Sequence, residues 1–74
     1  MMTTVLVFKT SVERKQQVDQ LSPVLDQLIS PGGRWNFDLE DCDNILRVET
    51  RNVQPVTISS VLAQFGFYCS ALED

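Results

Sequence analysis

The residue types that carry out most protein chemistry are sparse in this sequence. There is no histidine, which removes the commonest general base and the commonest ligand for transition metals. The two cysteines, Cys42 and Cys69, stand far apart. A nucleophile needs a base beside it, and Ser11, with Lys9 and Lys15 nearby, is the only candidate. These residues predict a protein without a catalytic site.

An acidic run at residues 38–43 offers oxygen ligands for a hard cation. It holds the carboxylates of Asp38, Glu40, Asp41 and Asp43. The spacing is not that of a calcium-binding loop, because the central glycine and the distal glutamate are absent. Cys42 lies between two of the aspartates, whose charges disfavour a reactive thiolate. We therefore expect a solvated acidic turn with an unreactive cysteine.

Length and charge limit the classes of protein and of partner. A chain of 74 residues has room for one domain, residues 1–74, with a small core. The net charge of -4 repels phosphate backbones and anionic lipid, so we expect no nucleic acid and no membrane as partner. The apolar runs are too short to cross a bilayer, and the first residues do not resemble a secretion signal. We expect a cytoplasmic protein.

The spacing of apolar residues predicts the first half of the fold. Residues 3–9 are apolar on both faces, as in a central strand. Residues 12–29 carry apolar side chains at spacings of three and four, which predicts an amphipathic helix. Pro23 inside this helix predicts a kink or a restart. Alternation over residues 35–40 predicts a half-buried strand after the Ser-Pro-Gly-Gly breaker.

The second half repeats this order. A turn at residues 41–44 leads to a strand at 45–50, and Pro55 opens a helix that ends at Gly66. Residues 67–72 form the last strand, in which Cys69 is expected to be a small buried residue not bridged to Cys42. The sequence thus predicts an α+β, ferredoxin-like βαββαβ two-layer sandwich, with its antiparallel strands in the order 4-1-3-2.

The element order, the length and the ending LAQFGF at residues 62–67 resemble the heavy-metal-associated domain family of copper and zinc chaperones and metal-pump modules. That family binds a soft metal through the two thiolates of a Met-x-Cys-x-x-Cys loop. With Val18 at the family's inward Val, the Met and Cys positions hold Lys9, Ser11 and Arg14. Serine is a poor ligand for copper(I) or zinc, and arginine cannot coordinate. The resemblance implies a degenerate site without a bound metal or other cofactor.

The sheet face away from the helices is the expected interaction surface. Alternation places six candidate residues there: Val5, Val7, Ile45, Arg47, Tyr68 and Leu72. Apolar patches often mark protein contacts, although scattered exposed hydrophobic residues are also normal on a small domain. We expect a non-enzymatic interaction module that binds a protein partner or forms a homodimer. The alternative is a divergent metal carrier that uses Cys42 with carboxylates or with a second chain.

Overall fold

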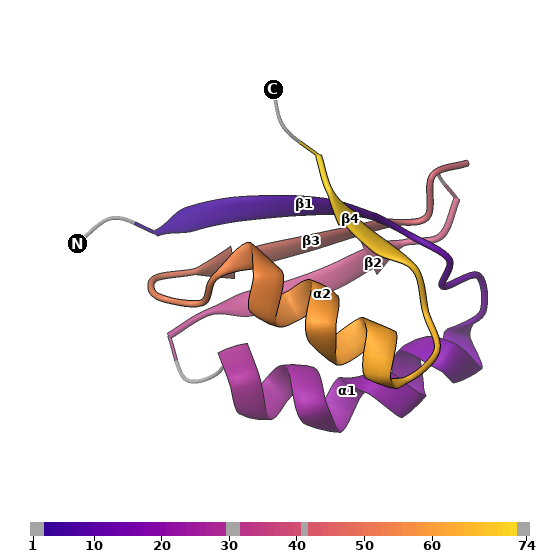
Figure 1. The fold of residues 1–74 in the computed structure, drawn as a ribbon, viewed down its shortest axis with the longest axis horizontal. Helices are drawn as coiled ribbons and strands as arrows, with labels where there is room; N and C mark the ends of the chain where they lie inside the picture. Colours follow the sequence, from indigo (N-terminus) through magenta and orange to yellow (C-terminus); the bar gives the residue numbers. More distant parts are fainter. Residues whose placement is uncertain (1–2, 30–31, 41, 73–74) are drawn as a thin grey trace.

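A computed structural model describes residues 3–29, 32–40 and 42–72 and places in them one antiparallel sheet with two helices on one face (Figure 1). The elements follow in the order β1 (Thr4–Thr10), α1 (Lys15–Ile29), β2 (Arg34–Asp38), β3 (Ile45–Thr50), α2 (Pro55–Gln64) and β4 (Cys69–Ala71). The strands lie in the order β2-β3-β1-β4. The predicted element order and strand order are confirmed.

β1 and β3 form the centre of the sheet, and β2 and β4 form its edges. β1 pairs with β3 from Thr4↔Thr50 to Lys9↔Ile45 and with β4 over only three residues. The β2 strand ends at Asp38, earlier than the alternation predicted, because the Asp38 carboxylate accepts the Glu40 N–H at 3.2 Å and starts the turn.

Helix α1 begins at Lys15, three residues later than the apolar pattern predicted. Val12 is fully buried, but it reaches the core from the loop before the helix. The start of the helix is set by Gln17, whose Oε1 accepts the N–H groups of Glu13 at 2.8 Å and of Arg14 at 3.0 Å. This is one half of a capping box, and it satisfies amides that a helix start otherwise leaves unpaired.

Helix α1 continues through Pro23 as one element, so the predicted restart is not found. Proline lacks the N–H that would bond to the carbonyl of Asp19. The apolar stripe compensates for this loss, because Leu21 and Leu25 are fully buried and Ile29 is nearly so.

Helix α2 ends in a tight turn, and the last strand begins at a later residue than the sequence predicted. Gly66 has a φ of +86°, and its N–H donates to the carbonyl of Ala63 at 3.0 Å. The Phe67 N–H donates to the carbonyl of Leu62 at 2.9 Å, which completes a Schellman motif. The predicted cap at Gly66 is confirmed, but β4 begins at Cys69 because the Phe67 amide is already bonded to the helix.

The core lies between the sheet and the two helices. Its buried cluster draws on the central strands, both helices and the loop after β1: Phe8, Val12, Leu21, Leu25, Ile29, Leu46, Val48, Ile58 and Leu62. Half-buried side chains, Cys69 and Phe67 among them, pack against this cluster. In the part of the chain that the structure describes, neither helix is long and apolar enough to cross a membrane.

Candidate functional site on the open sheet face

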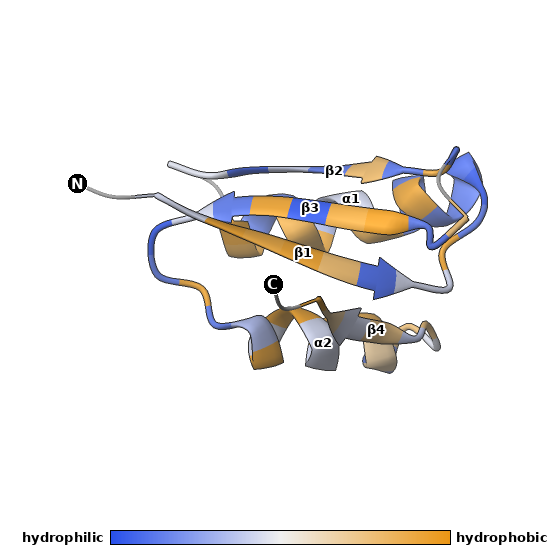
Figure 2. Ribbon diagram, turned by 90° about the horizontal axis from the view of Figure 1, so that it is seen from above, coloured by the Kyte–Doolittle hydropathy of each residue, from blue (hydrophilic) through white to orange (hydrophobic). Residues whose placement is uncertain are grey.

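The face of the sheet away from the helices, here called the open face, presents apolar side chains from β1 and from the segment around β4. Val5 is 54% exposed, Tyr68 58% and Leu72 46%. Val7 lies half-buried between them on β1. Figure 2 looks onto this face, where β1 is hydrophobic along most of its length. Exposed apolar side chains on adjacent strands form a surface that water solvates poorly.

Ile45 differs from the expected exposed position, since it is only 8% exposed although its register places it on the open face. It lies directly between Lys9 on β1 and Asp38 on β2. Lys9 also forms an ion pair with Asp43, with 3.5 Å between Nζ and Oδ1. Long flanking side chains shield an aliphatic residue in this way. Ile45 is therefore largely covered on the open face and offers little contact surface.

Arg47 on β3 provides the open face with a positively charged side chain that could bind an acidic group. It is exposed, it lies opposite Val7, and the described residues provide no ion pair for it. The neighbouring Arg34, by contrast, lies 3.8 Å from a carboxylate oxygen of Glu49. A pocket of about 260 Å³ opens here between β2 and β3, lined by Arg34, Trp35, Asn36, Arg47 and Glu49. An unpaired guanidinium at a pocket suits a carboxylate ligand.

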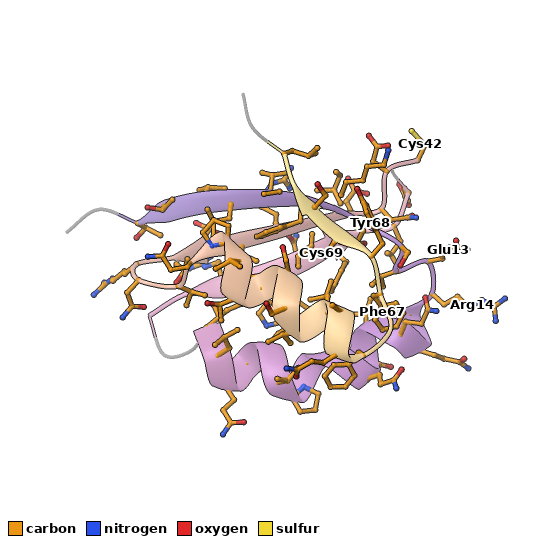
Figure 3. The ribbon with its side chains drawn as sticks, in the orientation of Figure 1. Glu13, Arg14, Cys42, Phe67, Tyr68 and Cys69 are labelled. Atoms are coloured by element: carbon orange, nitrogen blue, oxygen red, sulfur yellow. The ribbon has the colours of Figure 1, made fainter. Side chains whose placement is uncertain are left out.

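Ser11 and Arg14, the two positions at which the resemblance predicts lost metal ligands, lie in the loop between β1 and α1. The Ser11 hydroxyl accepts the Tyr68 N–H at 2.8 Å, and the Ser11 N–H donates to the Tyr68 carbonyl at 3.1 Å. Ser11 thereby joins the loop to the start of β4. Arg14 is exposed, and Figure 3 shows its side chain directed away from the molecule. Both side chains thus serve structure or solvent contact, and neither supplies a soft donor atom.

The Ser11 hydroxyl also has no catalytic partner in the described residues. Lys9 is paired with Asp43, and no hydrogen bond joins Lys15 to Ser11. A serine nucleophile needs a base within hydrogen-bonding reach, and here its oxygen is engaged by the Tyr68 amide.

The two cysteines are free thiols in different surroundings (Figure 3). Cys42 is exposed in the turn between β2 and β3. Cys69 is half-buried on β4, and burial raises the pKa of its thiol, an effect that a hydrogen bond from Ser59 partly opposes. The Ser59 Oγ lies 3.9 Å from the Cys69 Sγ. Cys69 was predicted to be a small buried residue; it packs against the core but is only half-buried.

Among the residues that the structure describes, the acidic turn does not bring a set of carboxylates together as ligands for a cation. Asp38 accepts a backbone amide, Asp43 pairs with Lys9, and Glu40 is exposed. Asp41, which the acidic run also includes, lies outside the described residues. In the described part of the chain, no three His, Cys, Asp or Glu side chains group closely enough to hold a metal ion.

Sequence reasoning located the open face by alternation but missed two of its features. The shielding of Ile45 depends on which side chains flank it, and the alternating pattern does not carry that information. The joint between Ser11 and Tyr68 links residues that are 57 positions apart, so no local signal predicts it. Comparisons with models of protein families, with curated proteins and with solved structures find no match for this chain.

Proposed function

We propose that this chain is a non-enzymatic protein-interaction domain that binds its partner through the open face. The observation that carries the proposal is the apolar surface of Val5, Val7, Tyr68 and Leu72 beside Arg47, an exposed cation without an ion pair in the described residues. Apolar contact area with an arginine at its border is the composition in which binding energy concentrates at protein interfaces.

The chemistry of the open face supports one kind of partner. Apolar side chains of the partner cover β1, and a carboxylate of the partner pairs with Arg47 next to the pocket between β2 and β3. The acidic character of the chain as a whole does not prevent this contact, because Arg47 and Arg34 both border the pocket.

We further propose that the fold is ferredoxin-like and that the chain is a relative of the heavy-metal-associated domains that has lost their metal-binding cysteines. The strand order β2-β3-β1-β4 supports the first part, and the presence of Ser11 and Arg14 at the two ligand positions supports the second. A metal carrier that uses the exposed Cys42 is the competing proposal. Submicromolar copper(I) binding that Cys42→Ser abolishes would favour it.

The proposal is tested by crosslinking and then by charge reversal. A photo-crosslinking amino acid placed at Val5 should capture a partner in the cells that make this protein, whereas the same group at Gln20, exposed on α1, should not. With the captured partner purified, Arg47→Glu should weaken binding about tenfold or more, because the introduced carboxylate repels that of the partner. Arg51→Glu is the matched control, since Arg51 is exposed in the loop after β3. Equal capture at Gln20, or equal effects of the two reversals, would contradict the proposal.

A further inference from the structure

The last third of the described chain carries no charge. All six basic and all ten acidic residues lie outside residues 52–72, the segment that contains α2 and β4. The same segment holds most of the large exposed hydrophobic side chains: Val56, Phe65, Tyr68 and Leu72. Figure 2 shows α2 and β4 together beyond β1, on the side of the molecule away from β2. One side of a protein with a net charge of -4 is therefore neutral and partly apolar.

Among the residues that the structure describes, no strand pairs with the outer side of β4. The Tyr68 carbonyl accepts the Ser11 N–H, and the Leu72 N–H donates to the Val7 carbonyl, so these two residues direct their backbone groups toward β1. In an antiparallel ladder alternate residues bond to opposite sides. Cys69 and Ala71 therefore direct their N–H and C=O groups away from β1, to the edge of the sheet.

Proteins block edge-to-edge pairing with charged side chains, proline, bulges or very short edge strands. β4 is short, but among the described residues its edge carries no charge and no proline. β4 contains only Cys69, Ser70 and Ala71, and none of the flanking residues between Gly66 and Leu72 is charged or a proline. The other edge strand, β2, carries Arg34 and Asp38 at its two ends.

We propose that β4 and the outer side of α2 form a symmetric interface with a second copy of this chain, in which the two β4 strands pair antiparallel and the sheet continues through both copies. With Ser70 opposite Ser70 of the second copy, Cys69 lies opposite Ala71 of that copy. Their outward N–H and C=O groups then bond to each other, twice by symmetry.

The same register pairs the exposed apolar side chains. Tyr68 lies opposite Leu72 of the second copy, and both side chains lie on the open face, where they are 58% and 46% exposed in the single chain. An aromatic side chain opposite an aliphatic one is a favourable cross-strand pair. Below the sheet, the exposed side of α2, with Val56, Ser60 and Ala63, continues the neutral surface toward the other copy.

Charge favours this edge over other surfaces for contact between two copies. Two chains that each carry a net charge of -4 repel one another least where charged residues are sparse, and residues 52–72, although Glu73 and Asp74 follow them in the sequence, form its longest uncharged segment. The uncharged strand that fits this edge is present in the chain itself. The inference goes beyond the open-face proposal and does not depend on it. Both involve Tyr68 and Leu72, but Val5 on β1 and Arg47 on β3 lie away from the paired edge.

Sedimentation equilibrium of the purified protein over a range of concentrations tests this inference. The wild-type chain should form dimers, and Tyr68→Lys should weaken dimerisation about tenfold or more, because both symmetric cross-strand pairs lose their apolar contact. Combining Tyr68→Lys with Leu72→Glu should restore the dimer, since the introduced opposite charges face each other only in this register. Circular dichroism of each variant checks that the fold is kept.

Two further variants separate this interface from other modes of association. Ala71→Pro removes an outward N–H without touching the bonds to β1, a position where an edge strand tolerates proline, and it should give monomers. Val5→Lys should leave the dimer unchanged, because Val5 lies on the open face away from β4. A wild-type chain that stays monomeric, a double variant that fails to dimerise, or a Val5→Lys variant that alone dissociates the dimer would overturn the inference.

Discussion

The β2 edge of the sheet carries charged side chains at both ends, whereas the β4 edge and all of residues 52–72 carry none. β2 is also fixed to the helix layer, because the Trp35 Nε1–H donates to the Asp26 carboxylate at 2.9 Å. The Trp35 ring packs edge-to-face on Phe37, with 5.9 Å between the ring centroids. One edge is thus closed to a further strand by charge and packing, and the other is left open.

The two edges also use glycine for different physical reasons. Gly33, just before β2, lies where the backbone of the sheet and the end of α1 come very close. Gly66, just before the β4 segment, has open space around it but a φ of +86°. The first position excludes a side chain by lack of space, and the second disfavours one by backbone conformation. This difference can be measured as a difference in stability.

Gly33→Ala should give the largest loss of stability. A Cβ at this position would lie 2.5 Å from the Glu49 carbonyl oxygen and 2.9 Å from the Ile29 carbonyl oxygen, and neither backbone atom can move without disturbing β3 or α1. We expect the free energy of unfolding to fall by about 2 to 3 kcal/mol, the cost of overpacking a rigid site. Urea unfolding followed by circular dichroism measures it. A loss well below about 1 kcal/mol would mean that the backbone around Gly33 can shift to make room for a Cβ, contrary to what its close contacts indicate.

Gly66→Ala should cost less, about 1 kcal/mol, because the added methyl group meets nothing within 4 Å and only the left-handed backbone resists it. Gly66→Asn is the matched control, since asparagine adopts this conformation more readily than alanine, and it should lose less stability. The same urea titration compares both variants with Gly33→Ala. Suppose instead that Gly66→Ala lost the most stability of the three variants. Then it would be wrong that lack of space limits substitution at Gly33 more strongly than backbone conformation limits it at Gly66.

The pattern of the sequence predicted the architecture because each element has a strong local signal. Leu21, Leu25 and Ile29 recur on one face of α1, and the inward residues of β3 alternate with outward ones, so the elements could be predicted without coordinates. The strand order β2-β3-β1-β4 was then predicted from the βαββαβ element order. Gly66 could be predicted as a cap because few other residues take its conformation.

The element boundaries could not be predicted because side chains far from the pattern set them. Val12 fits the apolar period of α1 but is buried from a loop, since Gln17 caps the helix at a later residue. β4 is short because the Phe67 amide is bonded to Leu62. The candidate site shows the same limit: alternation placed Ile45 on the open face, and only the flanking side chains bury it there.

The smallest expected effects concern the two thiols, Cys69 on the β4 edge and Cys42 in the turn after β2. Because burial raises the pKa of Cys69 above its ordinary value of 9.0, the folded chain holds this proton more tightly than the unfolded chain does. Stability from this group is therefore complete below about pH 9 and is lost as the pH rises toward the raised pKa.

Urea unfolding at about pH 8 and about pH 10 should show a smaller loss of stability in Cys69→Ala than in the wild-type chain, because alanine has no proton to release. Cys42→Ala, which removes an exposed thiol, is the matched control for the loss of a cysteine side chain. A disulfide reagent added to the folded protein near neutral pH should modify Cys42 well before Cys69, since Cys42 is exposed, whereas Cys69 is half-buried and burial raises the pKa of its thiol. Equal rates at the two thiols would mean that β4 opens readily to solvent, and an edge that opens in this way would not hold a second strand.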